Sequence, residues 1–92
     1  MLMIDTEFPG AELIAQGIRD LALRAETVES LLVSLSAPRL RALGIAVSLP
    51  LPDAELRLYQ LLSNRYGAAA HSRYNALIRR VVSFQRAAAC AR

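Results

Sequence analysis

The chain contains very little cysteine and histidine. Cys90 and His71 are the only residues of these types among 92. One cysteine cannot form an intramolecular disulfide, and one histidine cannot supply a two-histidine metal site. No carboxylate lies at helical spacing from His71 to complete such a site. These absences predict no metal and no cofactor, and they favour a reducing cytoplasm as the location.

Long apolar runs and a secretory leader are also missing. The first residues, Met-Leu-Met-Ile-Asp-Thr-Glu, have neither the basic start nor the apolar centre of a signal peptide. No run approaches the roughly 18 apolar residues of a membrane span. We therefore expect no membrane insertion, and the length of 92 residues predicts one domain over 1–92 with an N-terminal tail at 1–8.

Lysine is absent, so all 11 basic residues are arginine, as is typical of a GC-rich bacterial genome. Residues 1–29 hold six acids and two arginines, whereas the chain after Glu55 holds seven arginines and no acid. An acidic first part and a basic last part attract each other. This attraction can act within one chain or between two chains.

Apolar residues recur at helical spacing in five segments, which predict an all-α fold. The expected helices cover 10–25, 28–36, 38–43, 53–66 and a long amphipathic stretch from 68 to near the C-terminus. Thr27 and Ser36 are expected N-terminal caps, and Asp53 is expected as a cap or as a first-turn acid. Residues 45–52 contain two prolines and predict an extended connection. The result is a single small bundle of four to five helices, in which apolar residues on a wide arc predict 53–66 to be the most buried.

No catalytic pattern is present. Cys90 lies in the last turn of the chain, and the serines lack a recognisable base partner. The carboxylate pairs Glu26 with Glu29 and Asp53 with Glu55 stand at expected helix starts, where the helix dipole accounts for them. We therefore predict that the chain is not an enzyme. His71 and Asn75 remain a candidate polar site, in which we expect a half-buried histidine bonded to a neighbouring side chain.

Arginines of the last helix are candidate contacts for an anion or a partner. Helical spacing puts Arg73 and Arg80 on one side of the apolar stripe and Arg79 and Arg86 on the back. A small nucleic-acid-binding regulator is the alternative function, either through these arginines or through a helix-turn-helix that carries Arg39 and Arg41. Two separated pairs and a formal net charge of only +3 give this alternative modest support.

The leading hypothesis is a helical protein-interaction module that forms a homodimer, with another protein as the second possible partner. It rests on a hydrophobic content of 54%, which is high for so short a chain. The last helix would supply the interface, with arginines at its rim. The interface residues expected on this basis are Tyr74, Leu77, Ile78, Val81 and Phe84.

Overall fold

The computed structural model describes residues 7–91, which contain five α-helices and one turn of 3₁₀ helix. The helices are α1 (Ala11–Ala22), α2 (Val28–Leu35), α3 (Ala37–Ala42), α4 (Ala54–Tyr66) and α5 (Ala70–Cys90), with the 3₁₀ turn at Gly67–Ala69. The described residues contain no strand, so the predicted all-α fold with a long last helix is confirmed. Most of the predicted tail at 1–8 lies outside the described residues, and its last residue, Phe8, packs edge-on against Phe84 with ring centroids 6.1 Å apart.

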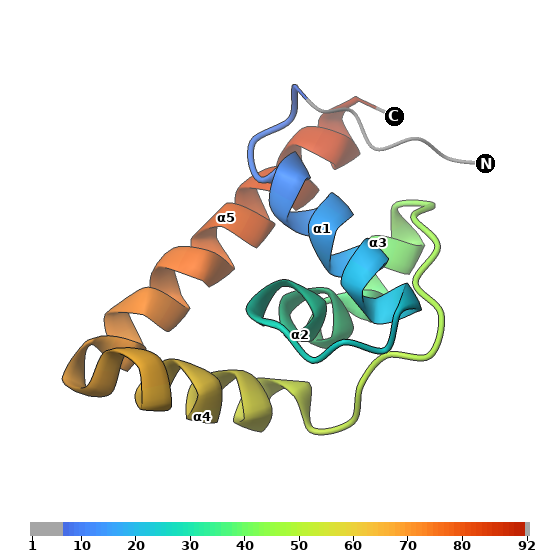
Figure 1. Ribbon diagram of the computed structural model, residues 1–92. Coiled ribbons are helices and arrows are strands. Elements are labelled where there is room, and N and C mark those ends of the chain that lie inside the picture. The colour runs from blue at the N-terminus through green and yellow to red at the C-terminus, as the bar shows by residue number, and fades with distance from the viewer. Residues whose placement is uncertain (1–6, 92) are drawn as a thin grey trace.

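The helices α4 and α5 form the two arms of a V, and α1, α2 and α3 lie between the arms (Figure 1). The central helix is α2, which contacts each of the other four α-helices. The radius of gyration of 12.7 Å is close to the value of about 12 Å expected for a folded chain of this length. None of the described helices is long and apolar enough to cross a membrane.

The most buried helix is α2, so the expectation that 53–66 would be the most buried is wrong. Five consecutive residues, Ser30–Ser34, are buried, which means that α2 meets the core around its whole circumference. In α4 only Ala54, Leu58 and Leu62 are buried, along a single stripe. Leu56 of α4 is 60% exposed. The two serines made α2 look half polar in sequence, although both hydroxyls bond to nearby backbone groups.

Thr27 caps α2 as predicted. Its Oγ1 accepts a hydrogen bond from the Ser30 N–H at 3.0 Å, and the Ser30 Oγ accepts one from the Thr27 N–H at 2.8 Å. The Thr27 hydroxyl also donates to the Asp20 carboxylate at 2.7 Å, which helps to hold the pKa of Asp20 below its usual value. Ser36 and Asp53 stand at the N-cap positions of α3 and α4, as predicted, but neither side chain forms a capping hydrogen bond. A cap needs extended backbone, but Ser36 has φ −95° and ψ 1°, and Asp53 has φ 53°.

Residues 43–53 form the extended connection that was predicted at 45–52. Within this connection, Ile45 and Val47 are buried in the core. The Arg41 Nε of α3 donates to the Val47 carbonyl at 2.9 Å, and the Ser34 Oγ of α2 accepts from the Leu51 N–H at 3.0 Å. Side chains of α2 and α3 therefore fix the path of the connection between α3 and α4.

The variant Ser34→Ala should lower the free energy of unfolding by about 1–2 kcal/mol, because it leaves the Leu51 N–H without its acceptor in a partly buried setting. Urea unfolding followed by circular dichroism measures the change. The matched control is Ser83→Ala, which removes an exposed hydroxyl from α5 and should change stability by less than about 0.5 kcal/mol. Equal stability of the two variants would show that the bond from Leu51 does not hold the connection.

Candidate functional site

The apolar stripe of α5, which we expected at a dimer interface, packs on the core of its own chain. Val81 and Phe84 are 3% and 1% exposed. Tyr74, Leu77 and Ile78 are partly buried against the same core. A side chain buried to the extent of Val81 or Phe84 meets another chain only if helices separate. The structure therefore leaves only Tyr74, Leu77 and Ile78 of the expected interface within reach of a partner.

The four candidate arginines of α5 fall on two sides of the helix, as their spacing predicts. Arg80 forms an ion pair with Glu12, so the acidic first helix and the basic last helix meet within one chain. The Arg73 guanidinium lies over the Tyr66 ring, 4.4 Å from its centroid. Arg79 and Arg86 are exposed and have no ion-pair partner among the described residues.

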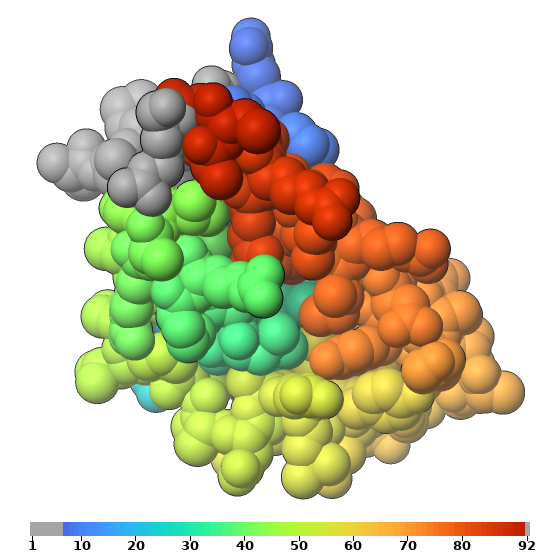
Figure 2. Space-filling view, turned by 180° about the vertical axis from the view of Figure 1, so that it is seen from behind, coloured from blue at the N-terminus to red at the C-terminus, as the bar shows by residue number. Residues whose placement is uncertain are grey.

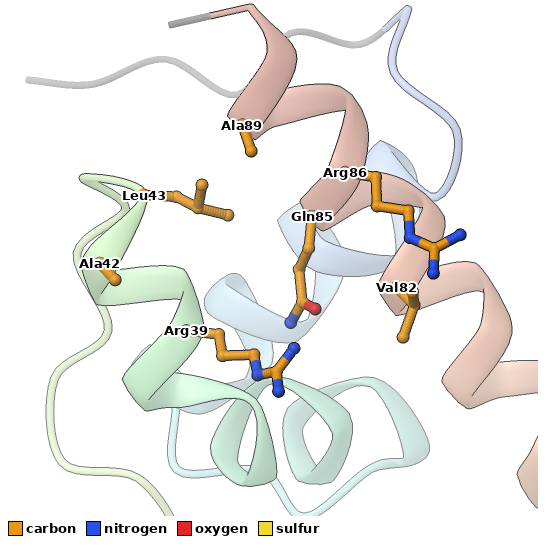
Figure 3. Close-up of a pocket in the computed structure, with 7 residues that line it drawn as sticks. All are labelled: Arg39, Ala42, Leu43, Val82, Gln85, Arg86 and Ala89. Carbon is orange, nitrogen blue, oxygen red and sulfur yellow. The ribbon is translucent and has the colours of Figure 1, made fainter.

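A groove runs between α3 and the C-terminal half of α5. In Figure 2 these two helices border a hollow on the face turned away from the viewer of Figure 1. Two adjoining cavities of about 470 Å³ and 400 Å³ make up the groove, and both are lined by Arg39, Val82 and Gln85. Figure 3 shows Arg39 of α3 and Gln85 of α5 extending into the space between the helices, while Arg86 stands at the outer side.

The lining of the groove is apolar and basic. Aliphatic residues form its walls: Leu35, Pro38 and Leu43 on the side of α2 and α3, and Ile78, Val82 and Ala89 on α5. Its charged lining residues are Arg39 and Arg86, and no acidic residue lines either cavity. Arg39, like Arg86, has no ion-pair partner among the described residues. Two unneutralised guanidinium groups beside apolar walls suit a ligand that is apolar on one side and acidic on its flanks.

The sequence contained a signal for the α5 wall of this groove that the interface prediction missed. Ile78, Val82, Gln85 and Ala89 recur at steps of four, three and four residues, which puts them on one face of a helix. This face lies beside the core stripe and includes only one aliphatic residue of the expected interface, Ile78. The opposite wall comes from α3, and nothing in the local pattern of Arg39 indicates which helix it faces.

His71 and Asn75, the candidate polar site, form a small hydrogen-bonded cluster with Tyr59 of α4. The Tyr59 hydroxyl lies 2.9 Å from Nδ1 of His71, and the Asn75 amide lies 3.2 Å from Nε2. The predicted bond from His71 to a neighbour is confirmed, but the histidine is exposed rather than half-buried. Tyr59 also packs on Tyr74 with ring centroids 5.4 Å apart. Burial, with the nearby Glu55 and Tyr59, raises the pKa of Tyr74. This cluster joins α4 to α5 close to the turn between them.

No group of three or more histidine, cysteine, aspartate or glutamate side chains that could hold a metal ion occurs within residues 7–91. The thiol of Cys90 is free and exposed at the end of α5. The groove and the His71 cluster each include several of the candidate residues. Comparisons with known protein families, with curated proteins and with solved structures find no match to this chain.

Proposed function

We propose that this chain is a protein-interaction module that binds an acidic amphipathic helix of another protein in the groove between α3 and α5. The observation that carries the proposal is the groove's composition, which combines aliphatic walls with Arg39 and Arg86 and includes no acid. From Ile78 to Ala89 the α5 wall extends for about 16 Å, the length of three helical turns. A helix with apolar residues on one face and acids beside them complements such a wall.

A second copy of the chain fits the groove less well than a different protein does. In a two-fold dimer across this surface, Arg39 and Arg86 of one chain would lie near the same arginines of the other. Like charges facing each other in an interface oppose association. We therefore favour a complex with another protein over the homodimer expected from the sequence. Light scattering across a dilution series tests this order, since the favoured complex requires a chain that is monomeric on its own.

Binding of nucleic acid has less support than binding of protein. Arg80 is paired with Glu12, and Arg73 is stacked on Tyr66, while Arg86 lies on a different side of α5. A phosphate backbone is bound best by a continuous basic stripe. A short acidic helix needs only Arg39 and Arg86, the two arginines that line the groove.

We place this module in the cytoplasm and assign it no catalytic role. The exposed free thiol of Cys90 is compatible with a reducing compartment. An exposed His71 bonded to Tyr59 and Asn75 has structural partners but stands outside the residues that line the groove. The proposed function therefore depends on the groove alone.

A labelled 15-residue helical peptide tests the proposal, with leucine on one face and glutamate on its flanks. Fluorescence anisotropy should show that this peptide binds, and that a peptide with the same leucines and arginine in place of glutamate binds at least roughly tenfold more weakly. The variants Arg39→Glu and Arg86→Glu should each weaken binding of the acidic peptide by roughly tenfold and improve binding of the basic one.

The matched control is Arg19→Glu, which makes the same change of charge on the exposed side of α1. It should leave the affinity for both peptides within about a factor of two, because surface charges farther apart than a Debye length are screened. Equal loss of binding in Arg19→Glu and Arg86→Glu would mean that net charge, not the groove, attracts the peptide. A stable dimer that excludes the peptide would assign the groove to a second copy instead.

A further inference from the structure

A second cavity, separate from the groove, lies where the start of α2, the end of α4 and the first half of α5 meet. Its volume is about 290 Å³. Arg65 comes from the last turn of α4, and Arg73 and Arg80 come from α5 two turns apart, so three guanidinium groups line one small space. Leu62 and Leu77 supply apolar wall between them. The cavity therefore concentrates positive charge beside an apolar wall.

Most hydrogen-bond donors of these three arginines are unused. Together they carry about fifteen N–H groups. Among the described residues, only Nη2 of Arg80 has an acceptor, the Glu12 carboxylate of α1. Arg73 lies over the Tyr66 ring at 4.4 Å, a contact that fixes the plane of its guanidinium and leaves its N–H edges free. Two of the three side chains are thus held in place, by Glu12 and by Tyr66, before any ligand arrives.

One acid, Glu29, also lines the cavity. It stands in the first turn of α2, where the positive end of the helix dipole stabilises a carboxylate. Three arginines and one glutamate give the lining a formal charge of +2, and the Glu12 carboxylate paired with Arg80 lowers the charge around the cavity to +1. The remaining positive charge attracts a small oxyanion, whereas the Glu29 carboxylate opposes its binding at close range.

We propose that this cavity binds a small oxyanion, a phosphate ion or a small phosphate monoester, through Arg65, Arg73 and Arg80. Guanidinium groups recognise phosphate oxygens with paired N–H bonds, and the cavity presents three such groups. The site is independent of the groove, because no residue lines both. Helix binding in the groove and oxyanion binding in this cavity can therefore be tested separately, and failure of one does not contradict the other.

Titration of the ¹⁵N-labelled full chain with inorganic phosphate, and separately with phenyl phosphate, tests the site by nuclear magnetic resonance. Backbone and arginine side-chain signals around Tyr66 and Arg73 should shift and then saturate. The variants Arg65→Gln and Arg73→Gln should each weaken binding roughly fivefold, since each loses one charged donor pair. Glu29→Gln should tighten binding roughly threefold, because it removes the opposing charge.

The matched control is Arg86→Gln, which lowers the net charge by the same amount on the other side of α5 and should leave the affinity for phosphate within about a factor of two. Tighter binding of phenyl phosphate than of phosphate would assign the site to a monoester, and equal binding would assign it to the free ion. Shifts that rise without saturating would overturn the proposal. So would an unchanged affinity in Glu29→Gln, or equal weakening in Arg86→Gln and Arg73→Gln.

Discussion

The substitution Gly17→Ala should destabilise the fold by about 2–3 kcal/mol, although alanine is the better helix former by about 1 kcal/mol. Gly17 lies in α1 where this helix crosses α2. A Cβ atom at this position would lie 2.4 Å from the Glu29 carbonyl oxygen and 2.4 Å from Cγ2 of Val33. Because the oxygen belongs to the backbone of a buried helix, α1 and α2 must move apart to relieve the clash, and the loss of packing exceeds the gain in helix propensity.

Denaturant unfolding measures this effect, and Gly67→Ala provides the comparison. A Cβ atom at Gly67 would meet nothing within 4 Å, but φ is +58°, so the variant tests backbone strain alone. We expect it to lose about 1–3 kcal/mol, because φ 58° with ψ −124° lies in a region that residues with a Cβ atom rarely adopt. If Gly17→Ala were instead more stable than the parent chain, helix propensity would have prevailed, and the close approach of α1 to α2 would be wrong.

The helices could be predicted from the sequence because their signals are local. Apolar spacing within ten to twenty residues defines a helix, and the Thr27 cap is read from the residues that follow it. The same applies to the extended connection after Gly44, where proline fixes the backbone and glycine takes the left-handed conformation at φ 87°. Each of these features depends on neighbours in the chain rather than on the packing of distant segments.

The packing order of the helices and the groove could not be predicted in the same way. Burial of α2 depends on Ser30 and Ser34 finding backbone partners, and a sequence pattern counts both serines as polar. The groove combines Arg39 of α3 with Arg86 of α5. These two helices are separated along the chain by the connection at 43–53 and by α4. The apolar content of α5 predicts a dimer surface, whereas the chain uses Val81 and Phe84 to complete its own core. Composition shows how much apolar surface exists and not which chain covers it.

Phe84→Ala should lower the free energy of unfolding by about 3–5 kcal/mol, a large part of the 5–15 kcal/mol typical of a whole domain. The side chain is 1% exposed, and its ring meets Phe8 edge-on. Truncation to alanine leaves a cavity at the point where α5 meets the start of α1, near the ion pair of Glu12 with Arg80. Thermal unfolding should show a fall of roughly 15 °C or more in Tm.

This substitution also separates the two roles that the apolar stripe of α5 could have. If Phe84 were a contact between chains, its loss would change the mass of the particle in solution and leave the unfolding of the monomer nearly unaltered. A core residue does the reverse, so we expect unchanged mass at a temperature where the variant is still folded. Leu56→Ala, which truncates a side chain that is 60% exposed on α4, should change stability by less than about 0.5 kcal/mol. If the two variants had similar stability, Phe84 would not be a core residue. It would then belong to the surface through which the chain contacts a partner.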